Sequence, residues 1–148
     1  MPNRKPLIAT RLAVRFAVIA IAAVAVLAGA STLGVRALQA QVPGFKRVEL
    51  QRHDVSVAGH EAVMARGEFN PGAAVPKHTH PGEEVAYILE GQILLEVEGK
   101  PAATLKPGDV FFIAPGQVHS ARNVGTGPAK ILSTYIVEKG KPLAAMVK

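Results

Sequence analysis

The sequence predicts an all-β domain, either a sandwich or a closed barrel, that follows an apolar N-terminal segment. After residue 40, no long stretch has helical periodicity, and short apolar or alternating runs are cut repeatedly by Gly and Pro. The chain has 148 residues, which is room for one ordinary domain and a short additional segment.

The N-terminal segment has the composition of a targeting sequence. Residues 1–40 hold five basic residues and no acidic one, and residues 16–35 form an uncharged run of 20 residues. A basic start followed by an apolar run is typical of a secretory signal, so we expect the rest of the chain in the periplasm or outside the cell.

Three fates of this segment are open from the sequence. Cleavage after Ala30 or Ala40 would release the domain, whereas an uncleaved run at residues 16–35 would anchor it, because 20 apolar residues can span a bilayer core of about 30 Å. A buried core helix is the third. The membrane is expected as a partner only through an uncleaved anchor.

The formal net charge of +6 belongs almost entirely to this segment. It contributes +5, and the remaining 12 basic residues are nearly balanced by 11 acidic ones. The pI near 9.9 therefore does not indicate nucleic-acid binding. The chain has no cysteine, which excludes disulfides, thiolate metal sites and cysteine nucleophiles.

The expected elements of the domain are short strands. Residues 41–47 are predicted to be a linker broken at Pro43-Gly44, and the domain is expected over residues 48–148. We expect residues 87–99 to form a hairpin that turns at Gly91, and the tail from residue 138 to form at most a short strand. The expected strands are 48–55, 61–69, 84–90, 92–98, 102–105, 109–114, 118–123 and 129–137.

Four residues of the domain have the chemistry of a metal site. His78 and His80 lie at i and i+2, a spacing that points both imidazoles to the same face of a strand. Glu84 follows after a Pro-Gly turn, and His119 lies in a later expected strand. Taken singly, each has an ordinary interpretation as a surface histidine, a solvated turn residue or a turn cap. The other two histidines of the domain, His53 and His60, are expected at the surface.

Together these residues resemble the two conserved motifs of the cupin superfamily. The first is Gly72-(x5)-His78-x-His80-(x3)-Glu84-(x6)-Gly91, and the second is Gly108-(x5)-Ala114-x-Gly116-(x2)-His119-(x3)-Asn123. The second departs from the family pattern at Ala114, where a proline is usual, which concerns turn rigidity and not ligation. The short spacer between the motifs resembles that of small microbial single-barrel cupins, and the resemblance covers residues 60–137.

The resemblance implies a single jelly-roll-like β-barrel that holds one divalent metal on His78, His80, Glu84 and His119. Nitrogen and oxygen ligands without sulfur favour Mn, Fe, Ni or Co over Zn or Cu and leave one or two coordination positions open. A divalent ion with one carboxylate carries a net charge of about +1, which favours a small anionic or chelating oxygen ligand. Glu84 is the expected acid or base.

Strand alternation gives the expected lining of the site. Glu84 fixes one parity, so Ala86 and Ile88 should face inward and Val85 and Tyr87 outward. By the same argument Asn123 shares the face of His119. The residues expected near the ligand are Met64, Arg66, Ile88, Gln117 and Asn123.

Three functions are compatible with this sequence. The resemblance permits an oxidoreductase of the dioxygenase kind, or a related lyase or isomerase, that acts on a small oxygen-rich molecule. The alternatives are a periplasmic module that binds or senses a small molecule, and a metal-binding protein without turnover. No helix-turn-helix segment and no second cupin copy is evident in the sequence. We expect a homodimer, with residues 48–55 as a sheet edge available for pairing.

Overall fold

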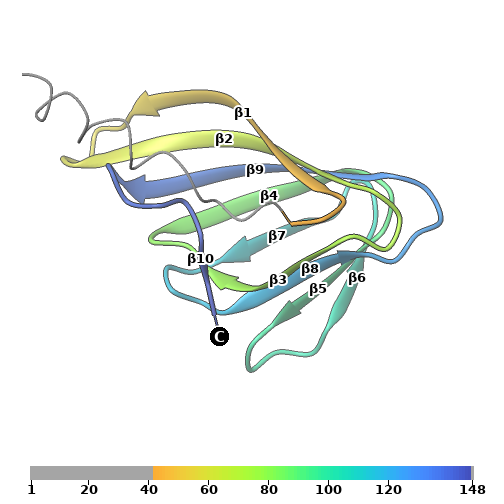
Figure 1. Cartoon of the computed structure of the whole chain (residues 1–148). Coiled ribbons are helices and arrows are strands. Elements are labelled where there is room, and N and C mark those ends of the chain that lie inside the picture. The colour runs from red at the N-terminus through yellow and green to blue at the C-terminus, as the bar shows by residue number, and fades with distance from the viewer. Residues whose placement is uncertain (1–41, 148) are drawn as a thin grey trace, which may run out of the picture. The chain divides into compact units, whose positions relative to one another are not determined.

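The domain consists of two facing antiparallel sheets of five strands each (Figure 1). The computed structural model describes residues 42–147, so the expected signal or anchor at residues 1–40 lies outside the described part. Within residues 42–147, no helix is long and apolar enough to cross a membrane. The expectation of an all-β domain is confirmed.

The chain passes back and forth between the two sheets. The first sheet has the order β1 (Phe45–Asp54), β2 (His60–Phe69), β9 (Ala129–Glu138), β4 (Glu83–Glu90) and β7 (Val110–Ile113). The second has the order β10 (Ala145–Met146), β3 (Ala74–Thr79), β8 (His119–Asn123), β5 (Ile93–Val97) and β6 (Ala103–Leu105). Because most connections cross from one sheet to the other, the inward faces of both sheets enclose one interior.

Alternation along the strands forms the core between the sheets. In β4, Ala86 and Ile88 are buried while Val85 and Tyr87 are exposed, as the sequence predicts. In β9 every second residue is buried over the whole strand. The main apolar cluster consists of Phe69, Ala73, Val75, Ala86, Ile88, Ile93, Ala121, Ala129 and Ile131.

The connection at Gly91 is a corner between the sheets, and the expected hairpin is wrong. Strand β4 pairs with β7 and β9, whereas β5 pairs with β6 and β8. Gly91 has a φ of 78°, and a Cβ added there would lie 2.6 Å from the Cβ of Ala129. The corner therefore requires glycine. Apolar runs on both sides of a glycine do not distinguish a hairpin from such a corner.

Two strands differ from the sequence-based expectation. Strand β1 begins at Phe45, within the expected linker, and the Phe45 ring packs against Phe69 with 4.6 Å between centroids. Strand β3, which contains Pro76, is not among the expected strands, although the spacing of His78 and His80 implies a strand there. Its pairing with β8 is irregular between Val75 and His78, and a proline is tolerated at such an irregularity. The short strand expected in the tail is β10.

Candidate metal centre

Strands from both sheets bring His78, His80, Glu84 and His119 together in the interior. His78 lies in β3 directly opposite His119, the first residue of β8. His80 follows the end of β3, and Glu84 comes from β4, opposite Tyr135 of β9. All four predicted site residues are buried, with exposed fractions of 5% or less.

The imidazole rings converge on one point. The nitrogen atoms that the three histidines offer lie within 4.8 Å of one another. The Oε2 atom of Glu84 lies 3.2 Å from Nε2 of His80 and 3.5 Å from Nε2 of His119. The structure therefore brings together the four residues that the sequence predicts as metal ligands.

Backbone carbonyl groups fix the tautomer of each histidine. Nδ1 of His78 lies 2.8 Å from the carbonyl oxygen of Pro76, and Nδ1 of His119 lies 2.9 Å from that of Gln117. Nδ1 of His80 lies 2.6 Å from the carbonyl oxygen of Leu143, in the segment that precedes β10. A carbonyl oxygen only accepts, so each Nδ1 carries the proton and each neutral ring presents the Nε2 lone pair inward.

This arrangement leaves four acceptors facing one another without a proton between them. The Glu84 carboxylate and the three Nε2 lone pairs share a small buried volume, and Nε2 of His80 has no hydrogen-bond partner among residues 42–147. Buried acceptors without donors cost free energy unless a cation is present. Three imidazole nitrogens and one carboxylate are a donor set that suits a divalent metal ion, so the site fits one.

The ionisation states agree with this interpretation. Burial, and then the neighbouring His119, lower the pKa of His78 to about 4, so its ring is neutral at pH 7. Burial by itself would raise the pKa of Glu84, but the neighbouring imidazoles of His119 and His80 outweigh it and hold that pKa well below its usual range. Neutral imidazoles beside an ionised carboxylate are the forms in which these side chains bind metal.

Gly82 allows β4 to start close to β9 and so places Glu84. A Cβ added to Gly82 would lie 1.9 Å from the carbonyl oxygen of Ile136, a backbone atom that cannot move aside. The glycine between the first two histidines and Glu84 therefore has a steric reason, because the chain must pass directly against β9 before it enters the site.

A cavity of about 440 Å³, including open space at its mouth, lies beside this cluster. His78, Glu84 and His119 form part of its wall, and most of the rest is apolar. Much of that volume is open space, and the part that the centre of a water-sized sphere can occupy is about 40 Å³. This is enough for a few water molecules, so a larger ligand would extend into the mouth. The other lining residues are Phe45, Arg47, Ala65, Gly67, Phe69, Val75, Leu95, Phe111, Ala121, Ile131, Ser133 and Tyr135.

Two polar residues of β9, Ser133 and Tyr135, face the cavity and were missed in the sequence. The pKa of Tyr135 lies above its ordinary value because of burial and then the charge of Glu84, so the phenol keeps its proton. Its ring packs against His80 with 4.8 Å between centroids. The missed signal was two hydroxyl groups on the buried face of a strand whose other inward residues are apolar.

The prediction that Met64 and Arg66 line the site is wrong. The inward face of β2 carries Val63 and Ala65, which are almost completely buried. Arg66 instead forms an ion pair with Glu68, at 2.7 Å between Nη2 and Oε1. The sequence leaves the parity of β2 ambiguous, because each face carries a charged residue beside small or apolar ones.

The remaining three residues expected near the ligand are also absent from the cavity wall. Ile88 faces inward as predicted but is packed in the apolar core. Gln117 is half-buried and donates to the carbonyl oxygen of Glu98 at 3.1 Å. Asn123 is buried and donates its amide to the carbonyl oxygens of Asn70 and Gly127, at 3.2 and 2.8 Å. Its side chain joins two loops and has no free group for a ligand.

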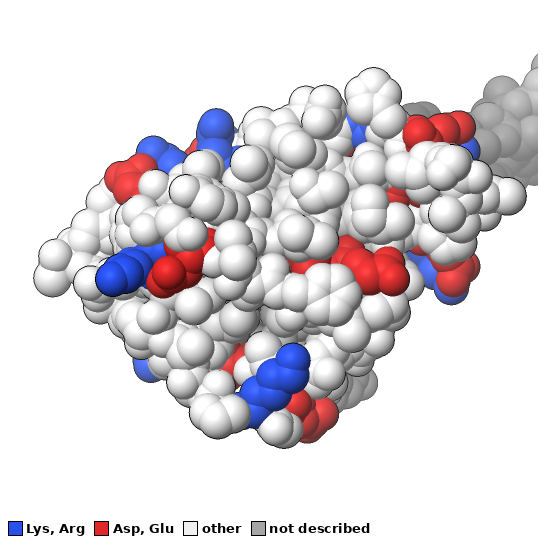
Figure 2. Space-filling view, turned by 180° about the vertical axis from the view of Figure 1, so that it is seen from behind, with Lys and Arg blue, Asp and Glu red and all other residues white. Residues whose placement is uncertain are grey.

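The other two histidines of the domain lie away from this cluster. His53 is exposed on β1, and His60 is half-buried with Nδ1 3.0 Å from the carbonyl oxygen of Ala58. On the face that Figure 2 shows, basic and acidic side chains are scattered and form no continuous basic patch.

Comparison with known proteins identifies the family of this fold and site. Residues 65–135 match the family model of the cupin domain. A germin-like protein, subfamily 2 member 2, of Arabidopsis thaliana is 42% identical over 79 residues, which are 49% of this chain and 35% of that protein. The oxalate-binding protein of Thermotoga maritima is 37% identical over 76 residues, 51% of this chain and 62% of that protein.

A solved structure agrees with the sequence comparison. Recombinant oxalate oxidase in complex with glycolate matches with a TM-score of 0.58 and 25% identity, over 75% of this chain and 59% of that one. The matched segment is 35% of the germin-like protein and 62% of the oxalate-binding protein, so this chain corresponds to only part of each relative. Motifs, sheet order, histidine cluster and relatives agree, and the chain belongs to the cupin superfamily as a small cupin-domain protein.

Proposed function

We propose that this chain is an exported, metal-dependent cupin that acts on a small anionic, oxygen-rich molecule as an oxygenase or a related lyase or isomerase. One divalent ion would be held by His78, His80, Glu84 and His119, with Mn, Fe, Ni or Co preferred over Zn or Cu. The observation that carries the proposal is the convergence of three buried imidazoles on the Glu84 carboxylate, with Nε2 of His80 lacking any hydrogen-bond partner among residues 42–147.

The ion would supply Lewis acidity to an anionic oxygen ligand and, as a redox metal, reactivity with dioxygen. The chain's own residues supply the remainder. Mostly apolar walls surround the cavity, and Tyr135 holds a proton beside the Glu84 carboxylate. Glu84 is either a permanent ligand or a base that accepts a proton from the bound molecule. The relatives support a small acid as the ligand, since two of them are named for oxalate.

Metal analysis of the protein, purified from the compartment in which it accumulates, tests the proposal. We expect about one divalent ion per chain, a redox metal, and oxygen uptake or product formation with one member of a panel. The panel contains oxalate, glycolate, other hydroxy acids, flavonols, catechols and diketones. A metal-loaded protein that turns over none of these would place the binding module ahead of the enzyme.

The variant Glu84→Gln separates the two roles of Glu84. An amide keeps an oxygen that can bind the ion but accepts no proton. If Glu84 is the base, the variant retains metal and loses turnover. If Glu84 is only a ligand, metal affinity and turnover fall together. Metal content by elemental analysis and product formation are measured on the same samples.

The alternative function is a module that binds or senses a small molecule without turnover. A relative named as an oxalate-binding protein favours it. Calorimetric titration of the metal-loaded chain with oxalate and glycolate distinguishes this case. Binding without oxygen uptake or product would support the module, whereas the absence of both binding and product would leave a metal-binding protein alone.

Export and dimerisation belong to the proposal as well. A reporter fused after Pro43 should be active outside the cytoplasm, and a cytosolic reporter would contradict the targeting role of residues 1–40.

Strand β1 is a free edge of its sheet, and exposed apolar side chains such as Val85, Val110 and Phe112 lie on the outside of β4 and β7. Sedimentation should give a homodimer at micromolar concentration, and a monomer would refute it.

A further inference from the structure

The cavity beside the histidine cluster contains a second charged group, far from the metal ligands in sequence. Among its lining residues only Glu84 and Arg47 carry a full charge at neutral pH. Glu84 belongs to the proposed ligand set, where a bound cation would offset its charge. Arg47 comes from β1, the edge strand of the same sheet that β2 and β9 separate from β4, and is half-buried.

Arg47 lines the cavity beside Gly67 of β2. Arg47 is paired in register with Gly67, which presents no side chain. A Cβ added to Gly67 would lie 3.2 Å from the ring of Phe45 and 3.3 Å from that of Phe69, so this spot is already crowded by aromatic edges. The guanidinium carbon of Arg47 lies 5.8 Å from the centroid of the Tyr135 ring, a cation–π distance. Tyr135 in turn packs against His80.

Arg47 differs from neighbouring arginines in its lack of an anionic partner. Arg52 forms ion pairs with Glu49 and Glu61, and Arg66 forms one with Glu68. Among residues 42–147, no carboxylate lies within 4.0 Å of a side-chain nitrogen of Arg47. A guanidinium beside aromatic rings is only partly hydrated, and its planar fork matches a carboxylate in two parallel hydrogen bonds.

We propose that Arg47 binds a second anionic group of the ligand, so that this cupin selects small dianions over monoanions. One anionic oxygen group of the ligand takes the metal site and a carboxylate at its other end pairs with Arg47. The inference rests on the proposed function, because it assumes that a metal-bound ligand occupies the cavity. It narrows the ligand class to short molecules with two acidic groups at a distance from each other.

Calorimetric titration of the full-length, Mn²⁺-loaded chain tests the inference with matched probes. The dicarboxylates malonate, succinate and glutarate are compared with acetate, propionate and butyrate, which lack the second carboxylate. We expect at least one dicarboxylate to bind tenfold or more tightly than its monocarboxylate partner, because a charge-assisted bidentate pair contributes about tenfold to a hundredfold.

Two variants assign that preference to Arg47, and one serves as control. Arg47→Gln should remove the preference for the dicarboxylate and leave metal content and monocarboxylate affinity as in the wild type. Arg47→Lys should keep part of the preference, because the positive charge remains although the planar guanidinium group is lost. Arg66→Gln, on the other face of β2, should behave as the wild type in every titration.

Several results would overturn the inference and leave the proposed function intact. One is a wild-type chain that binds monocarboxylates and dicarboxylates with equal affinity. Another is an Arg47→Gln variant whose preference for the dicarboxylate is as large as that of the wild type. An equal loss of monocarboxylate and dicarboxylate affinity in Arg47→Gln would show damage to the metal site and also contradict it. A wild-type chain that takes up no metal would refute the proposed function itself, and elemental analysis before titration identifies that case.

Discussion

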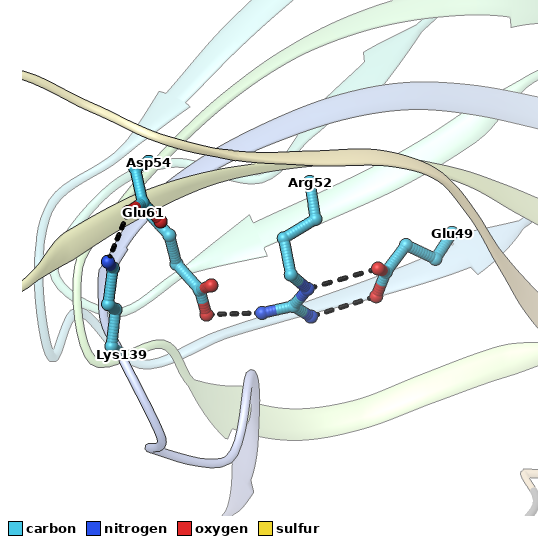
Figure 3. A network of polar contacts seen from close by, with 5 residues as sticks. All are labelled: Glu49, Arg52, Asp54, Glu61 and Lys139. Atoms are coloured by element: carbon cyan, nitrogen blue, oxygen red, sulfur yellow. Dashed lines mark hydrogen bonds and ion pairs between the residues drawn. The ribbon is translucent and has the colours of Figure 1, made fainter.

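Two clusters of charged and polar side chains, one inside the domain and one on its surface, differ in what they leave unpaired. On the surface, Arg52 donates to both carboxylate oxygens of Glu49, at 3.0 and 2.8 Å, and also pairs with Glu61 (Figure 3). Lys139 pairs with Asp54 at 2.6 Å. Each carboxylate in this network has a cationic donor, and the arginine is 42% exposed.

The inner cluster has the opposite balance. Glu84 and three Nε2 lone pairs are all acceptors, and each histidine has already used its donor on a backbone carbonyl. Burial removes the water that would otherwise satisfy them. The comparison teaches that a group of charged side chains does not by itself identify a binding site. Buried acceptors that face one another without donors from their own ring nitrogens do. Substitutions and pH should therefore act very differently on the two clusters.

The largest effect is expected from His80→Ala. The variant loses one ligand of a closed set, so metal affinity should fall by an order of magnitude or more. The thermal stabilisation on adding metal, about 4 kcal/mol for the wild type at a thousand times Kd, should shrink accordingly. Thermal melts with and without metal measure it. His53→Ala on the surface is the control, and equal losses in both variants would contradict the assignment of the site.

The pH dependence of the metal-free domain should show the buried cluster directly. The pKa of His78 is about 4 in the folded domain and 6.5 in the unfolded chain, so the unfolded chain binds more protons between these values. The free energy of unfolding should therefore fall as pH falls from about 6.5 to about 4, by on the order of 3 kcal/mol. Urea titrations across this range measure it.

A matched variant identifies the source of that slope. In His78→Gln the same titrations should be flatter between pH 6.5 and 4. The surface carboxylate of Glu49 has a lowered pKa because of its hydrogen bond with Arg52, so its contribution is lost only at lower pH. A slope unchanged in His78→Gln would show that another group is responsible.

Asn123→Ala tests whether burial alone makes a polar residue functional. Asn123 is buried like Glu84, but its amide is satisfied by backbone carbonyls and its Oδ1 accepts from the backbone of Gly125 at 2.9 Å. The variant should lose about 2 kcal/mol of unfolding free energy, because backbone groups are left unpaired. Metal affinity should stay as in the wild type. A selective loss of metal affinity without loss of stability would contradict the structural role.

The smallest effect is expected from Glu49→Ala. This carboxylate is about half exposed and its ion pair is screened by solvent, so the unfolding free energy should change by less than about 1 kcal/mol. Added salt should reduce even this difference. Denaturant titrations at low and high salt measure it. A loss as large as that from Asn123→Ala would mean that the surface network contributes more than its exposure implies.

The ligand set was predictable from the sequence, whereas most of the cavity wall was not. The ligands lie in a motif of fixed spacing, and β4 has an unbroken alternation that gives its inward face. Strand β2 offers no such contrast, so the side of Met64 and Arg66 could not be decided. Arg47 lies before the first expected strand, and only the pairing with Gly67 brings it to the cavity. No local sequence pattern indicates which distant segments come into contact.

The carbonyl oxygen of Leu143 gives the site an order of assembly in time. His78 and His119 are oriented by carbonyls two residues away, so their partners are made almost together with them. His80 depends on a carbonyl 63 residues later in the chain, which translation at roughly 5–20 residues per second reaches only about 3 to 13 s afterwards. Until that segment docks against β3, the ring of His80 lacks the acceptor that fixes its tautomer, so the C-terminal segment completes the ligand set.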